Sequence, residues 1–180
     1  KLILMFSIPL LIGNIFQQFY SMVDTIIVGR FVGVEALAAV GSTGSMVFLV
    51  NGFVTGLTSG FAVLVSQRFG AKDEKGLKKA VGSAIILTAI SVIVVTLVSV
   101  ISAKPLLILM NTPENIMKDA TTYIIIIYAG CIATVAYNMI ASILRSLGDS
   151  KTPLYFLIVS SVLNIVLDLV FIINFNMGVA

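Results

Sequence analysis

Five long apolar segments, almost free of charge, decide what this chain can fold into. A helix needs about 20 apolar residues to cross a hydrocarbon layer of ~30 Å, and it satisfies its own backbone hydrogen bonds there. The pattern therefore predicts an all-α, polytopic transmembrane helix bundle of about five helices. The segments are residues 2–28, 40–66, 81–102, 122–144 and 154–173.

The composition excludes an ordinary soluble domain. Hydrophobic residues make up 59% of the chain and charged residues 11%, with a mean hydropathy of +1.14, whereas roughly a quarter of the residues in soluble domains are charged. The chain begins with Lys1 rather than Met and ends shortly after the fifth segment. We therefore expect a piece of a longer protein in the cell membrane.

The basic residues predict the orientation in the membrane. Eight lie on the side of the chain's first residue and three on the other, so the positive-inside rule predicts that the N-terminal side is cytoplasmic. This also explains the basic run from Arg68 to Lys79 without nucleic-acid binding. The eight are Lys1, Arg68, Lys72, Lys75, Lys78, Lys79, Arg145 and Lys151, and the three are Arg30, Lys104 and Lys118.

The segments are joined by short polar connections with turn signals. Residues 31–39 are expected to link the first two helices, Pro105 and Pro113 to break residues 104–119, and Pro153 to begin the fifth helix. Glycines at 52, 56 and 60 share one face of the second helix, which predicts a seam for close helix packing.

Only two formal charges, Asp24 and Asp168, lie inside the apolar segments. A charged Asp near the bilayer centre costs about 2.5–3.5 kcal/mol, so such a residue must face protein or water and marks an ion path by default. Asp24 lies six residues before Arg30, and Asp168 lies six before Asn174. At ~1.5 Å per residue, both should lie at one level in the outer half of the membrane.

Polar residues share a helix face with each carboxylate. The spacing i, i+3, i+7 places them on one stripe in each helix, and the two stripes predict a shared wet cavity if the helices are neighbours. The stripes are Gln17, Tyr20 and Asp24 in the first helix and Ser161, Asn164 and Asp168 in the fifth.

Such a site suits a cation. The carboxyl pair can take up a proton, or Asp24, Asp168 and Asn164 can bind Na⁺, because hard cations prefer oxygen ligands. An organic cation would compete for the same place, and mutual exclusion of two cations is the minimal requirement for antiport. A zinc site is not expected, since the chain has no His and a single cysteine, Cys131.

Structural roles for the same residues stay open at this point. Asp24 can be an interfacial carboxylate, Asp168 a hydrogen-bonding partner inside the bundle, and Tyr20 part of an aromatic belt. Asn138 in the fourth helix can be either a ligand or a hydrogen-bonding link between helices.

Four stretches resemble the multidrug and toxin extrusion (MATE) family. Residues 8–29 (IPLLIGNIFQQFYSMVDTIIVG) resemble its first helix, and residues 67–82 (QRFGAKDEKGLKKAVG) its connection between helices two and three. Residues 143–155 (ILRSLGDSKTPLY) and 164–172 (NIVLDLVFI) are similar to the connection before its fifth helix and to that helix.

The resemblance implies a transporter, without a cofactor, that exports organic cations in exchange for H⁺ or Na⁺. It implies twelve helices in two lobes, of which residues 1–180 would be most of the first. A cation site is expected at Asp24 and Asp168, with Tyr20, Asn164, Gln17 and Asn138 nearby. The expected partners are small cationic substrates, the lipid bilayer and the second lobe.

Three other functions fit the sequence less well than antiport. A flippase for lipid-linked oligosaccharides needs basic residues inside the spans, and the apolar segments hold none. An intramembrane aspartyl protease uses two buried Asp residues, but the surroundings VDT and LDL are not those of such an enzyme. A scaffold that transports nothing would not need matched acidic stripes.

Overall fold

The computed structural model describes the backbone of residues 2–175 and the side chains of residues 7–172. It contains five α-helices, which confirms the predicted all-α bundle. Four of them, α2 to α5, are long and apolar enough to span a membrane. The helices are α1 (Leu2–Ile27), α2 (Val34–Gly70), α3 (Glu74–Leu109), α4 (Glu114–Ser146) and α5 (Lys151–Phe175).

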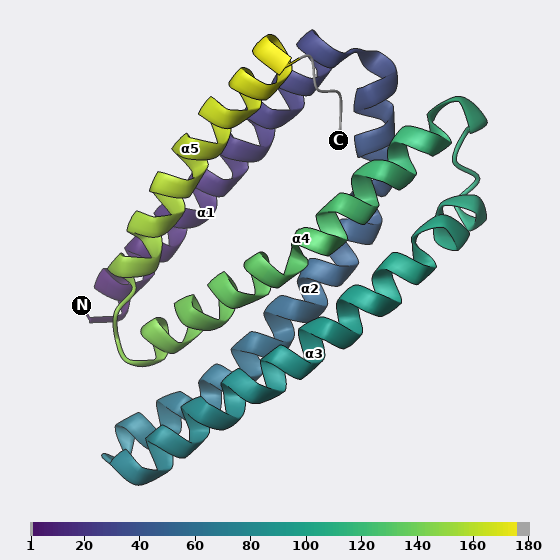
Figure 1. The fold of residues 1–180 in the computed structure, drawn as a ribbon. Helices are drawn as coiled ribbons and strands as arrows, with labels where there is room; N and C mark the ends of the chain where they lie inside the picture. Colours follow the sequence, from purple (N-terminus) through teal and green to yellow (C-terminus); the bar gives the residue numbers. More distant parts are fainter. Residues whose placement is uncertain (1, 176–180) are drawn as a thin grey trace.

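The helices form two groups (Figure 1). Helices α2, α3 and α4 pack against one another, whereas α1 runs beside α5 in the same direction along nearly its whole length. The α2–α3–α4 core is apolar and includes Val54, Leu107 and Ile124, which are fully buried. Large apolar side chains elsewhere on these helices, such as Phe48 and Ile101, are exposed, as expected for a surface that faces lipid.

Most helices extend beyond the apolar segments, because the flanking sequences also favour a helix. Helix α3 begins at Glu74, directly after Asp73, whose side chain accepts a hydrogen bond from the Gly76 N–H at 2.9 Å. The prediction that Pro105 breaks the chain is wrong: α3 continues to Leu109. A proline removes only one backbone hydrogen-bond donor from a helix. Pro105 does so in the last two turns of α3, where it is exposed.

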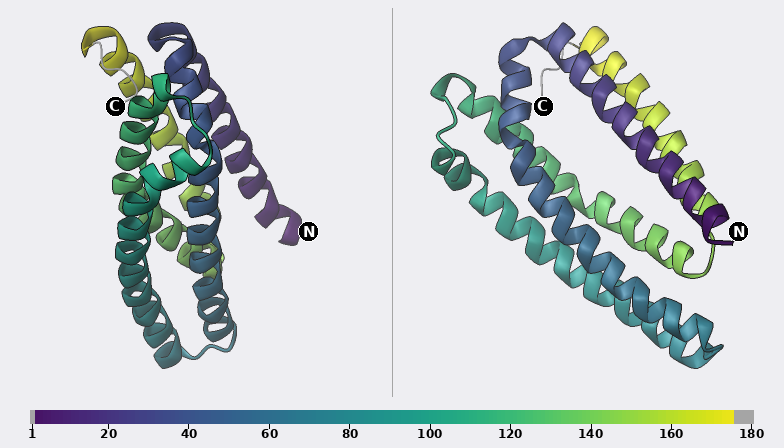
Figure 2. Two further views of the ribbon diagram at one scale, coloured as in Figure 1. Left: turned by 90° about the vertical axis from the view of Figure 1, so that its right-hand side faces the viewer. Right: turned by 180° about the vertical axis from the view of Figure 1, so that it is seen from behind.

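The turn between the first two helices is tighter than predicted. After α1, a π-helical turn (Val28–Val32) leads directly to Gly33, and α2 begins at the next residue. Gly33 has φ +123°, a conformation that side chains disfavour and glycine adopts readily. Residues 31–39 are therefore mostly helical rather than a loop, and Figure 2 shows the sharp reversal between α1 and α2.

The predicted glycine seam is not a contact among the described residues. A Cβ atom added at Gly52, Gly56 or Gly60 would meet nothing within 4 Å. This face of α2 is open.

The two ends of the bundle carry unequal charge. Lys1 lies outside the described residues. The seven other basic residues assigned to its side lie at the α2–α3 and α4–α5 turns, and Arg30, Lys104 and Lys118 lie at or near the α1–α2 and α3–α4 turns. Figure 2 shows these two pairs of turns at opposite ends of the bundle. Asn174, which the sequence analysis uses as the polar end of the fifth helix, has a side chain outside the described range.

We expect Gly76→Ala to destabilise the α2–α3 turn by about 1 kcal/mol, the typical value of a helix N-cap. A Cβ at position 76 would collide with the Asp73 carboxylate and approach Arg68, its ion-pair partner. Thermal unfolding of the full-length protein in detergent measures the loss. Gly70→Ala is the matched control, because its Cβ would meet nothing within 4 Å. Equal unfolding temperatures for the two variants would contradict the capping role.

Asp149 holds the start of α5. Its Oδ1 accepts backbone hydrogen bonds from Lys151 at 3.1 Å and Thr152 at 3.0 Å. Hydrogen bonding by the Thr152 side chain, together with these backbone donors, holds the pKa of Asp149 below its usual range.

The lowered pKa predicts a pH window. A carboxylate with a lowered folded pKa contributes stability above its unfolded pKa of about 3.9, and this contribution is lost as the pH falls through the folded pKa. Full-length protein should therefore unfold at a higher temperature than its Asp149→Asn variant, by a constant margin from about pH 8 to 5 and by less below about pH 4. A margin that changes near neutral pH would contradict this assignment.

Candidate cation site and polar cavity

The α1–α5 contact brings the two predicted stripes together. Gly13 is buried in this contact, and a Cβ added to it would lie 3.4 Å from Leu157 Cδ2 and 3.6 Å from Leu154 Cδ1. A small residue lets two helices approach closely in lipid. The adjacency of the first and fifth helices, which the sequence leaves open, is thus present in the structure.

The two carboxylates come close to each other. Asp24 of α1 and Asp168 of α5 are close enough to interact electrostatically, and Tyr20 interacts with both. All three side chains are partly buried. Two acids from parallel helices and a phenol therefore form one group, which we call the acidic cluster.

Two oxygen atoms of this region lack a partner. Asn164 Oδ1 and Asp168 Oδ2 are buried and accept no hydrogen bond from any described residue. They stand one turn apart on α5, and Ser161, also buried, lies at the preceding position of the stripe. Buried polar atoms are normally satisfied, so these two acceptors fit a proton or a cation as their partner.

Tyr123 of α4 belongs beside the acidic cluster, although the sequence did not single it out. It interacts electrostatically with Asp24 and with Tyr20, and it is partly buried. The run TTYIIIIYAG contains it as one of two aromatic polar residues among isoleucines. That contrast was the available signal, but only the three-dimensional structure shows that Tyr123 interacts electrostatically with Asp24.

The donor set limits the kind of ion. The described part of the chain holds no group of three or more His, Cys, Asp or Glu side chains that fits a metal ion. Two carboxylates and neutral oxygens suit a proton or a monovalent cation better than a divalent ion, which collects more charged ligands.

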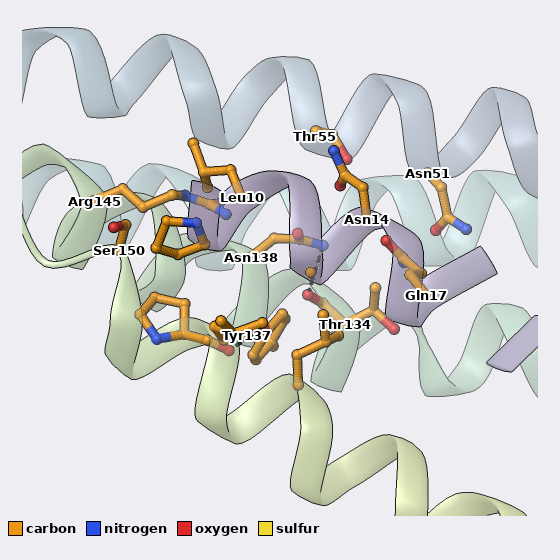
Figure 3. Close-up of a pocket in the computed structure, with 15 residues that line it drawn as sticks. Leu10, Asn14, Gln17, Asn51, Thr55, Thr134, Tyr137, Asn138, Arg145 and Ser150 are labelled. Carbon is orange, nitrogen blue, oxygen red and sulfur yellow. Dashed lines mark hydrogen bonds between the residues drawn. The ribbon is translucent and has the colours of Figure 1, made fainter. Parts of the chain in front are cut away.

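A separate polar cavity of about 280 Å³ opens between the two helix groups (Figure 3). Helices α1, α2, α4 and α5 all contribute to its wall. The polar side chains that line it are Asn14, Gln17, Asn51, Thr55, Thr134, Tyr137, Asn138, Arg145 and Ser150.

The structure therefore divides the predicted site residues. Gln17 and Asn138 line the cavity, whereas Tyr20, Asp24, Asn164 and Asp168 are not among its lining residues. Asn138 donates to the Thr134 carbonyl of its own helix at 3.0 Å and makes no hydrogen bond to another helix within the described residues. Its side chain points into the cavity instead (Figure 3).

Arg145 also reaches the cavity. The sequence placed it in the connection after the fourth helix, but α4 continues to Ser146. Arg145 thus stands in the last helical turn, partly buried, with its side chain beside Leu10 of α1 (Figure 3).

Comparison with known proteins decides the family. The sequence model of the MatE family matches residues 9–170, nearly the whole chain. The chain belongs to the MATE family. Its helices accordingly belong to a multi-pass membrane protein of this family.

Two similar proteins come from Bacillus subtilis (strain 168). The probable multidrug resistance protein YoeA is 39% identical over 163 residues, which are 91% of this chain and 35% of YoeA. The probable multidrug resistance protein YpnP is 34% identical over 180 residues, 100% of this chain and 40% of YpnP. The chain thus spans 35 to 40% of the length of these MATE proteins.

A solved structure confirms the fold. The outward-facing conformation of a multidrug resistance MATE family transporter superposes with a TM-score of 0.91 at 31% identity, over 99% of this chain and 40% of that protein. The arrangement of α1 and α5 beside the other three helices is therefore an arrangement found in MATE transporters.

Proposed function

We propose that the full-length protein is a secondary active antiporter that exports cationic or amphipathic compounds in exchange for H⁺ or Na⁺ by alternating access. The observation that carries the proposal is the acidic cluster: Asp24 and Asp168 interact across the α1–α5 contact, and Asp168 keeps a buried acceptor without a partner among the described residues. A carboxyl pair in a membrane marks an ion path by default.

Coupling needs a connection between ion and substrate, and α1 supplies one. Gln17 lines the cavity and Tyr20, almost one turn further along α1, interacts with both carboxylates. We propose that a cation in the acidic cluster stabilises one position of α1 against α5. Since α1 also forms a wall of the cavity, its position changes how well the cavity holds a substrate.

The remaining parts of the proposal concern the whole protein. Residues 1–180 form most of the first lobe, and the rest of the polypeptide supplies the second lobe and the other wall of the substrate path. The N-terminal side is cytoplasmic, as the distribution of basic residues favours. The multidrug resistance names of YoeA and YpnP support drug-like substrates.

The experiment is efflux by full-length protein in proteoliposomes, with a pH gradient and a Na⁺ gradient imposed separately. Antiport predicts that one gradient drives a fluorescent organic cation against its concentration gradient. Transport that only equilibrates the dye under both gradients would reject antiport, and the gradient that works identifies the coupling ion.

A lipid-linked oligosaccharide flippase is the second candidate, because Arg145 lines the cavity and a guanidinium binds phosphate. A flippase would move its lipid across the same proteoliposomes when neither the pH gradient nor the Na⁺ gradient is imposed. That result would distinguish it from an antiporter.

A further inference from the structure

The polar cavity carries a single charge, and that charge is positive. Of the described residues that line it, Arg145 is the only one with a formal charge. A neighbouring groove shares Leu10, Asn14 and Arg145 with the cavity and continues between α2 and α4. Its lining again includes no charge other than Arg145. A purely cationic compound would thus meet repulsion at this end of the space.

Several N–H donors of the Arg145 guanidinium make no hydrogen bond within the described residues. Arg145 Nη2 donates a hydrogen bond to Ser142 Oγ at 3.3 Å, and a guanidinium has five N–H donors. Within residues 7–172 the structure contains one ion pair, Arg68–Asp73, so Arg145 has no carboxylate partner there. An Arg that is partly buried and unpaired fits an anionic group from outside this part of the chain.

The surroundings of Arg145 suit such a group. Neutral polar side chains lie on both sides of Arg145: Asn14 of α1 lines the cavity and the groove, and Ser150 before α5 lines the cavity. Ser66 of α2 lines the groove, but its hydroxyl donates to Ala62 O at 3.0 Å. The Ser146 hydroxyl is already used, since it donates to Ala62 O at 3.0 Å and ties α4 to α2. This hydrogen bond fixes the backbone next to Arg145. The N–H groups of the Arg145 guanidinium stay available for two parallel hydrogen bonds to a carboxylate or phosphate.

We propose that Arg145 binds a carboxylate or phosphate group of the transported compound. The lobe would then favour amphiphiles that carry an anionic group, zwitterions included, over compounds that are only cationic. This inference rests on the proposed transport function, but it concerns binding and can be tested without transport.

The test uses two dyes of nearly equal size, a zwitterionic carboxy-rhodamine and its cationic methyl ester. Fluorescence polarisation measures the affinity of each for purified full-length protein in lipid-free detergent. Arg145→Gln should weaken binding of the carboxy-rhodamine roughly ten- to hundredfold, the range for a hydrogen-bonded charge, and leave the ester unchanged. Arg145→Lys should fall between, because it keeps the charge and loses the fork.

Lys151→Gln is the matched control. It removes one positive charge from the same end of the bundle, but Lys151 is exposed and lines neither the cavity nor the groove. It should change neither affinity. An Arg145→Gln variant that affects both dyes equally, or neither, would overturn the assignment.

A lipid headgroup is the other source of an anionic oxygen. Binding is therefore repeated in mixed micelles with phosphatidylglycerol. Retained preference of the wild type for the carboxy-rhodamine supports the substrate assignment, and loss of that preference assigns Arg145 to lipid and overturns it. If neither gradient drives efflux, antiport fails, whereas these binding results still decide the role of Arg145.

Discussion

Asp168→Asn in the full-length protein is expected to abolish gradient-driven efflux while membrane insertion stays normal. The substitution keeps the shape of the side chain and removes its charge, so the acidic cluster can no longer bind and release a cation. Efflux from proteoliposomes under the active gradient should fall to the rate of vesicles without protein. Protein yield in the membrane and elution as a single species check insertion.

The matched control is Asp119→Asn, which removes an exposed carboxylate near the N-terminal end of α4. It should leave the efflux rate unchanged. If Asp168→Asn transports as fast as the control, Asp168 has no part in coupling, and the two unpartnered acceptors on α5 are structural.

Asn164→Leu and Asn138→Leu are expected to separate the ion from the substrate. Asn164 has a buried oxygen next to Asp168, so Asn164→Leu should raise the ion concentration for half-maximal efflux roughly ten- to hundredfold, the loss expected for one hydrogen bond to a charged group. Asn138 lines the cavity, so Asn138→Leu should instead raise the substrate KM and leave the ion dependence unchanged.

The two variants are controls for each other, since both replace an amide by an isosteric apolar side chain within the spans. Efflux is measured over a series of ion concentrations at saturating substrate, and over a series of substrate concentrations at saturating ion. Parallel changes in both constants for both variants would mean that the acidic cluster and the cavity are one site.

Much of this arrangement was predictable from sequence because it follows from helical periodicity. The apolar segments identify the five helices, whereas the common membrane level of Asp24 and Asp168 stays a prediction. The contact between α1 and α5 was not predictable, since it depends on the small Gly13 lying against Leu154 and Leu157. No local pattern states which of several apolar helix faces will pair.

The helix ends show the limit of hydropathy. Helix α4 runs past the last apolar residue to Ser146, and this extra length turns Arg145 from a loop residue into part of the cavity wall. Arg, Lys and Glu are good helix formers in water, so an apolar segment marks the part within lipid and not the whole helix. Tyr123 was missed for a related reason: its importance comes from a neighbouring helix and not from its own.

The proposed antiport depends most on one property of the protein. A cation bound in the acidic cluster and a substrate bound in the cavity must exclude each other through the position of α1. Addition of substrate to purified full-length protein, with a pH indicator or a Na⁺ electrode in weakly buffered solution, tests it directly. The account predicts release of the bound cation on substrate addition to wild type and none from Asp168→Asn. Substrate binding that releases no cation from wild type, with an affinity independent of cation concentration, would contradict it.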